Sequence, residues 1–98
     1  MNIHEKIGVP AVLEQCAEEC TELAQICLKM ARKMRGENPT PMNYQDILVK
    51  LNEEMADVMV CMQALVDAEV ISYEAIDSVM VQKEERWEKR VNEKEEVE

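Results

Sequence analysis

Apolar residues recur at intervals of three and four along most of this 98-residue sequence, which is the spacing that places them on one face of an α-helix. The composition agrees, because Phe is absent and Gly occurs only twice, while Met alone occurs eight times. Helices favour Met, Leu, Ala, Glu and Lys and exclude Gly and Pro from their interiors. The sequence therefore predicts an all-α fold.

Proline, glycine and capping residues divide the chain into segments. Pro10 suits a first helical turn and Gly36 a helix end, whereas Pro39 and Pro41 cannot continue a helix. Asn43 and Ser72 are each a favourable N-cap. The expected segments are a lead-in (1–9), a helix (10–35), a loop (36–42), a helix (43–68), a helix (72–92) and a frayed, charged tail (93–98). We expect one domain, residues 1–98: an antiparallel helical bundle of three main helices, with a short fourth one in the lead-in.

Each long helix carries one apolar series that we expect to be its buried face. In the first helix the series is Leu13, Cys16, Ala17, Cys20, Leu23, Ala24, Cys27, Ala31 and Met34. In the second it is Leu48, Leu51, Met55, Val58, Met62, Leu65 and Val66. The inner face of the third comprises Ile76, Val79, Met80, Trp87 and Val91, with Lys83 among them. Trp87 is expected in the core or a dimer interface, with stacking on a base as the alternative.

Size and charge restrict the partners. A chain of this length builds only one small core, so we expect self-association to complete the bundle, as a homodimer or homotetramer. The formal net charge of −10 at pH 7 argues against nucleic acid as a direct partner, because phosphate backbones bind basic surfaces. No apolar run is long enough to cross a membrane, and no secretory signal is visible. We expect a cytoplasmic protein.

Four cysteines, Cys16, Cys20, Cys27 and Cys61, lie within the helical apolar patterns. None of the Cys-x-x-Cys spacings of a zinc site occurs, and a bridge between Cys16 and Cys20 would constrain little. We expect reduced core thiols, with a redox role as the alternative.

Two groups of acids interrupt the apolar series. Glu19 and Glu22 are three residues apart, as are Glu54 and Asp57, so each pair shares one face of its helix. If the first two long helices are antiparallel about a turn near residue 39, residues whose numbers sum to about 78 stand at one level. The four carboxylates are therefore expected to meet.

Carboxylates that crowd together repel one another unless one is protonated or a cation binds between them. A site made only of carboxylate oxygens suits Mg²⁺ or Mn²⁺. A ferritin-like di-iron site is disfavoured, because it needs two Glu-x-x-His units and His4 is the only histidine. The alternative is a solvated acidic face with partners one turn away, such as Lys50 for Glu54.

These motifs, Glu18-Glu19-x-x-Glu22 followed by Glu54-x-x-Asp57, resemble the signature of the MazG-like, all-α nucleoside triphosphate pyrophosphohydrolases. The resemblance covers roughly residues 10–91. It implies Mg²⁺-dependent cleavage of a nucleoside triphosphate between its α and β phosphates, giving the monophosphate and pyrophosphate. The segment between the two motifs is long for the family pattern, owing to residues 35–42.

The resemblance also implies roles for individual residues. Glu19, Glu22, Glu54 and Asp57 would be the metal ligands. Glu18 would help to position the attacking water, and Lys83 and Arg86 would hold phosphate oxygens. Two other functions are compatible with the same residues: an acidic helical interaction module that binds a basic partner, and a family member that binds nucleotide or metal without hydrolysis.

Overall fold

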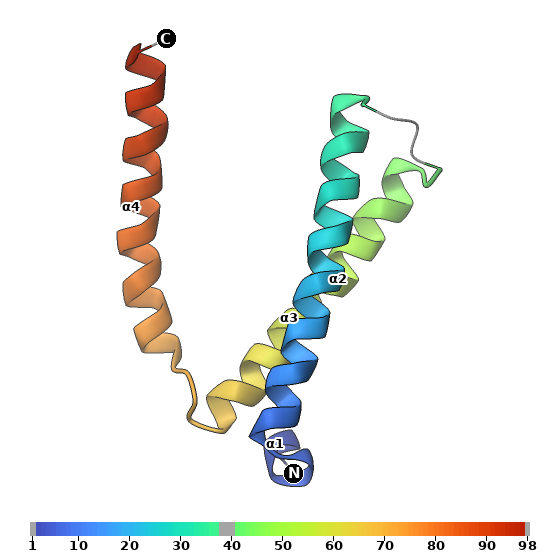
Figure 1. Ribbon diagram of the computed structural model, residues 1–98, viewed down its shortest axis with the longest axis vertical. Helices are drawn as coiled ribbons and strands as arrows, with labels where there is room; N and C mark the ends of the chain where they lie inside the picture. The colour runs from blue at the N-terminus through green and yellow to red at the C-terminus, as the bar shows by residue number, and fades with distance from the viewer. Residues whose placement is uncertain (1, 38–40, 98) are drawn as a thin grey trace.

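Four α-helices make up the computed structural model, which describes residues 2–37 and 41–97 (Figure 1). They are α1 (Ile3–Ile7), α2 (Val9–Arg35), α3 (Tyr44–Asp67) and α4 (Tyr73–Val97). No strand occurs in the described part of the chain. The all-α fold, with a short N-terminal helix ahead of three long ones, is confirmed. Within the same residues, none of the helices contains a stretch both long and apolar enough to cross a lipid bilayer.

The helix ends coincide with residues that satisfy free backbone groups. Pro10 lies in the first turn of α2, and Gly36 follows its last residue with a φ of 69°, a left-handed conformation that glycine adopts without steric cost. Asn43 and Ser72 each accept a hydrogen bond from the backbone N–H three residues later, at 2.9 and 3.0 Å. Of the loop expected over 36–42, residues 38–40 lie outside the described part.

The C-terminal helix is longer than predicted. α4 continues to Val97, through the segment that was expected to fray from residue 93. Glu and Lys, which dominate this segment, have high helix propensity. Lys89 Nζ also lies 4.0 Å from Glu93 Oε1, one turn further on, a spacing that supports a helix weakly.

α2 and α3 pack against each other as an antiparallel hairpin, with α1 beneath its N-terminal end (Figure 1). Its core consists of two clusters, Val12 with Ala64 and Leu65, and Ile26 with Met30 and Ile47. Ile47 is 0% exposed. This hairpin therefore contains the well-packed part of the chain.

The face of α2 that is buried differs from the predicted one. Val12, Ile26 and Met30 are buried, whereas most of the series from Leu13 to Met34 is exposed. The reason is that α2 has apolar residues on two adjacent faces, and packing against α3 covers only one of them. On α3 the same difference appears at Met55, which was expected inside the bundle and is exposed.

α4 stands away from the hairpin as a separate arm (Figure 1). Of its described side chains only Ile76 is half-buried; the others are exposed, and Trp87 is 67% exposed. The prediction that α4 packs an inner face into a core is therefore wrong for the single chain. The pattern is present, but nothing within the described chain covers it.

Candidate metal centre

The four acids predicted to meet are brought together by the hairpin. Glu19 and Glu22 of α2 and Glu54 and Asp57 of α3 each offer one carboxylate oxygen, and these four oxygens all lie within 4.8 Å of one another. The antiparallel packing of α2 on α3 places both pairs at the same level, as the residue numbers indicated. The predicted convergence is confirmed, and the role of these acids as metal ligands stays a prediction.

Two of the carboxylates have buried oxygens that lack a hydrogen-bond partner. Glu54 is 3% exposed, and its Oε2 is buried without a partner, as is Oε2 of Glu19. The other oxygen of Glu19 accepts a hydrogen bond from Gln15 Nε2 at 2.7 Å. A buried carboxylate oxygen without a donor is costly in free energy. The cluster therefore has the negative charge and the vacant acceptor atoms that a cation would satisfy.

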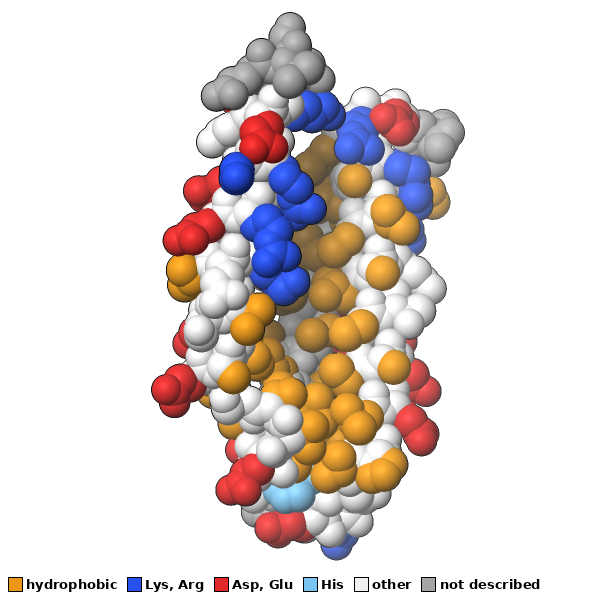
Figure 2. Space-filling view, turned by 60° about the vertical axis from the view of Figure 1, so that its left-hand side comes forward, with side chains coloured by type: hydrophobic (Ala, Val, Ile, Leu, Met, Phe, Trp, Pro, Cys, Tyr) orange, Lys and Arg blue, Asp and Glu red, His pale blue; other side chains and the backbone are white. Residues whose placement is uncertain are grey.

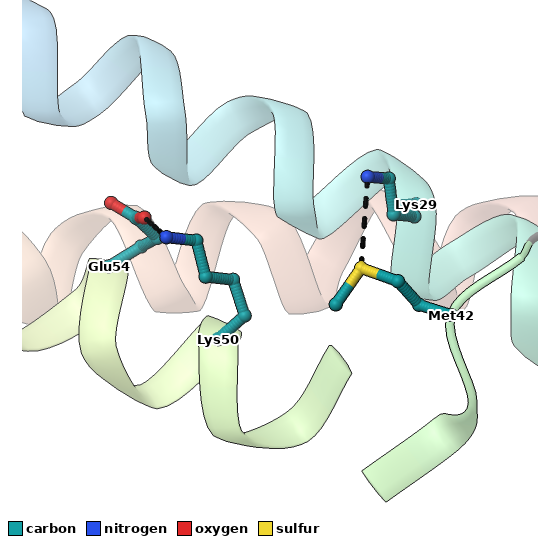
Figure 3. A network of polar contacts seen from close by, with 4 residues as sticks. All are labelled: Lys29, Met42, Lys50 and Glu54. Carbon is teal, nitrogen blue, oxygen red and sulfur yellow. Dashed lines mark hydrogen bonds and ion pairs between the residues drawn. The ribbon is translucent and has the colours of Figure 1, made fainter. Parts of the chain in front are cut away.

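Lys50 supplies the positive charge nearest to Glu54. Its Nζ lies 2.9 Å from Glu54 Oε1, one helical turn earlier on α3 (Figure 3). The hydrogen bond from Lys50 lowers the pKa of Glu54 despite the burial of this carboxyl group. The same hydrogen bond raises the pKa of Lys50. Glu54 is thus held ionised beside its neighbours.

Glu22 shows the effect of crowding most directly. The neighbouring carboxyl group of Glu54 raises the pKa of Glu22, and the negative charges of Glu19 and Glu54 raise this pKa further. A raised pKa means that Glu22 takes up a proton more readily than an isolated carboxyl group does, which would reduce the repulsion within the cluster. Glu22 and Glu54 therefore titrate as an interacting pair.

A depression of about 300 Å³ opens beside the acids. It is lined by Glu22, Gln25, Ile26, Lys29, Met42, Lys50 and Glu54. Lys29 Nζ lies 4.0 Å from the sulfur of Met42, and both residues line the depression (Figure 3). The side chains of Lys29 and Lys50 therefore border a depression whose wall also contains two of the clustered acids.

Sequence reasoning did not assign Lys29 and Lys50 to the site. Lys29 follows Glu22 by seven residues and Lys50 precedes Glu54 by four, so each shares a helical face with an acid. Under the antiparallel rule, Lys29 and Lys50 stand at one level of the hairpin, as the acids do at theirs. The rule and the shared helical faces together would therefore have placed both lysines near the acids.

The other predicted site residues are not brought to the cluster. Glu18 is exposed on α2 and is not one of the four converging acids. Lys83 and Arg86 are exposed on α4, which stands apart from the hairpin along its length (Figure 1). Within one chain, the expected phosphate-binding cations and the carboxylates lie on different parts of the molecule.

The thiols are only partly core residues. All four cysteines are free; Cys61 is buried and Cys16 half-buried, but Cys20 and Cys27 are exposed. The prediction of core thiols is therefore wrong for the latter two in the single chain, because they lie on the uncovered face of α2. Burial raises the pKa of Cys61, and the charges of Glu19 and Asp57 add to it. Such a thiol is a poor nucleophile.

Comparison with known proteins adds no family assignment, because no family model, no curated protein sequence and no solved structure matches this chain.

Proposed function

We propose that this chain is a Mg²⁺-dependent nucleoside triphosphate pyrophosphohydrolase. The observation that carries the proposal is the convergence of Glu19, Glu22, Glu54 and Asp57, whose oxygens lie within 4.8 Å of one another. They are four of the five acids at which the sequence resembles the MazG-like motif, the fifth being Glu18. The packing of α2 on α3 brings these like charges together although they repel one another.

The donor set fits a hard divalent cation. Every ligand on offer is a carboxylate oxygen, which suits Mg²⁺ and also Mn²⁺. The partnerless buried oxygens of Glu19 and Glu54 would gain a positive partner. When bound, the metal would neutralise the triphosphate and polarise its phosphoryl oxygens.

The remaining chemistry falls to residues of the chain. Water would attack the α-phosphorus and give up a proton to solvent, and the bond from this phosphorus to the α–β bridging oxygen would break, giving the monophosphate and pyrophosphate. Lys29 and Lys50, which border the depression, would bind phosphate oxygens. Lys50 would exchange its contact with Glu54 for one with the substrate. Glu18 would orient the water, and Lys83 and Arg86 would stabilise the charge that develops on the leaving group.

The test is release of pyrophosphate from a panel of ribo- and deoxynucleoside triphosphates, with Mg²⁺ and with EDTA. We expect Mg²⁺-dependent turnover of at least one member. Glu54→Gln should reduce turnover by about 100-fold or more, because loss of a group that only orients a metal ligand already costs about 10–100-fold. The control is Glu14→Gln, which removes one exposed acid of α2 and should leave turnover unchanged.

Failure would take one of two forms. A folded protein that binds Mn²⁺ through the four acids, seen by electron paramagnetic resonance, but releases no pyrophosphate is a non-hydrolysing binder. A folded protein with neither property fits an acidic interaction module. Either result removes the proposed activity.

A further inference from the structure

Two of the four clustered acids are held in the same way by a residue of their own helix. On α2, Gln15 Nε2 donates a hydrogen bond to Glu19 Oε1 at 2.7 Å. On α3, Lys50 Nζ lies 2.9 Å from Glu54 Oε1 (Figure 3). In both pairs the donor precedes the acid by four residues, the spacing at which side chains of one helix meet. We call Gln15 and Lys50 the clamp residues.

The clamp residues leave one oxygen vacant on each acid. Oε2 of Glu19 and Oε2 of Glu54 are both buried, and neither has a hydrogen-bond partner among the described residues. Both acids belong to the cluster whose oxygens lie within 4.8 Å of one another. A carboxylate held at one oxygen keeps its second oxygen in a fixed direction, which is how neighbouring groups orient metal ligands. The two hydrogen bonds therefore determine which acceptor atoms stay vacant.

A surface pair with the same spacing shows what is particular about the clamp residues. Gln63 Nε2 donates to Asp67 Oδ1 at 2.9 Å on α3, but Asp67 is exposed and is not one of the four converging acids. Gln63 also accepts a hydrogen bond from Tyr73 Oη, at the elbow between α3 and α4. A pair of this kind supports its helix only slightly. Gln15 and Lys50 differ from Gln63 because the acids they hold have a second, buried oxygen without a donor.

The two clamp residues differ in charge. Gln15 donates through a neutral amide, whereas Lys50 donates through an ammonium group. Figure 2 shows Lys and Arg side chains gathered along α4 and at the upper end of the hairpin. Beside the acids, the positive charges that line the depression are those of Lys29 and Lys50, and Lys50 is the one paired directly with a clustered acid. Lys50 thus offsets part of the negative charge of the cluster, and Gln15 offsets none.

We propose that Gln15 and Lys50 are positioning residues of the metal centre, which orient Glu19 and Glu54 through these hydrogen bonds, and that the charge of Lys50 sets how tightly the cation binds. Gln15 orients its acid without opposing the cation. Lys50 orients its acid and repels the cation at the same time. The inference rests on the metal site of the proposed function, but not on the hydrolytic reaction.

Donor and charge can be varied separately at these two positions. Gln15 shows that a glutamine reaches a glutamate four residues later, and Lys50 shows the same for a lysine. Lys50→Gln therefore keeps a donor for Glu54 and removes the charge. Gln15→Lys keeps a donor for Glu19 and adds a charge, whereas Gln15→Leu removes the donor without changing the charge.

The test is the affinity of the full chain for Mn²⁺ alone, measured by electron paramagnetic resonance without nucleotide. Gln15→Leu should weaken binding about 10- to 100-fold, the cost of losing a group that orients a metal ligand. Lys50→Gln should tighten binding about tenfold, the order of effect that one unit charge has on a divalent cation a few ångström away in water. Gln15→Lys should weaken binding by a similar factor. The double variant Gln15→Lys/Lys50→Gln should bind close to the parent, because it again has one neutral and one charged clamp residue.

The matched control is Gln63→Leu, which removes a hydrogen bond of the same kind outside the cluster and should leave the affinity for Mn²⁺ unchanged. Gln15, Lys50 and Gln63 are all exposed, so the variants should fold, and circular dichroism checks their helicity. The inference is overturned if Gln15→Leu binds like Gln63→Leu, or if Lys50→Gln binds more weakly than the parent. A parent that does not bind Mn²⁺ also overturns it.

Failure of the proposed function gives a different result. A parent that binds Mn²⁺, with variants in the expected order of affinity, but releases no pyrophosphate lacks the proposed activity and retains the positioning roles. A parent that releases pyrophosphate, with variants that all bind Mn²⁺ equally, retains the activity and lacks the positioning roles. Metal affinity and turnover therefore decide the two proposals separately.

Discussion

The hairpin and α4 are built from the same kind of sequence, yet they have different surroundings. Both carry apolar residues at helical spacing, but α2 and α3 each bury one apolar face against the other, whereas the inner face of α4 is exposed. The difference lies in what each helix can reach, because a short loop folds α2 onto α3 and a pinned elbow holds α4 away. Helical periodicity therefore indicates which face of a helix is apolar, but not what packs against that face.

The largest expected contrast is in core stability. Ile47→Ala empties a fully buried site and should lower the free energy of unfolding by about 2–5 kcal/mol. Val79→Ala removes an exposed side chain of α4, and in a single chain this costs less than about 0.5 kcal/mol. Denaturant unfolding at several protein concentrations measures both. In a dimer, the cost of Val79→Ala is larger and appears as a weaker association. Equal and concentration-independent costs would contradict the difference between the two regions.

The next contrast concerns metal binding. Mg²⁺ at a hundred times its dissociation constant should stabilise the protein by about 2.7 kcal/mol. Asp57→Asn relieves repulsion among the acids, so in EDTA this variant should melt at or above the parent temperature, while its gain from Mg²⁺ shrinks. Asp77→Asn makes the same change on α4 and should leave the gain unchanged. An unreduced gain in Asp57→Asn would contradict its assignment as a ligand.

The two N-caps offer a matched comparison of smaller size. Asn43→Ala and Ser72→Ala each remove a hydrogen bond to the first turn of a helix, and such a loss costs about 1 kcal/mol. We expect both variants to lose this amount in denaturant unfolding, because a single small domain is expected to unfold in one cooperative transition. If α4 were an independent arm, Ser72→Ala would fray α4 in hydrogen exchange and leave the unfolding of the hairpin unchanged.

The smallest effect is a dependence of stability on pH. The pKa of Glu22 is raised above its ordinary value of 4.5 in the folded protein, so the folded state binds this proton more tightly than the unfolded state. Stability is therefore lost as pH rises above 4.5 through the raised pKa. In EDTA, Glu22→Gln should be more stable than the parent at neutral pH, and the advantage should vanish below pH 4.5.

The opposite sign is expected for Glu54, whose pKa is lowered by Lys50. The stability that ionised Glu54 contributes is present above the ordinary pKa of this carboxyl group and is lost as the pH falls through its lowered pKa. Melting temperatures across the acidic range distinguish the two groups, with Glu14→Gln as the control. An advantage of Glu22→Gln that stays constant with pH would show that repulsion at this residue is not its cause.

The helices were predictable because their signals are local. Pro10, Gly36, Asn43 and Ser72 act within one or two turns of the chain, and the observed helix ends lie within one residue of the predicted ones except at the end of α4. The meeting of the acids was predictable too, since a short loop leaves α3 little freedom to slide along α2. A residue's level along the hairpin therefore followed from its number.

The rotation of each helix about its axis was not predictable. α2 offers two adjacent apolar faces, and only packing against α3 selects the one with Val12, Ile26 and Met30. The elbow contact of Tyr73 with Gln63, which sets α4 apart, joins side chains whose meeting depends on the geometry of a turn. The ion pair of Lys50 with Glu54 matters for the site only because Glu54 is buried.

By itself, the sequence determined where the helices begin and end and which acids share a helical face, because these properties depend on residues a few positions apart. Only the tertiary structure decided that Glu54 is buried, that one apolar face of α2 is used while the other is left uncovered, and that α4 stands away from the acids. Those outcomes depend on contacts between residues far apart in the chain, where several packings satisfy the same local pattern.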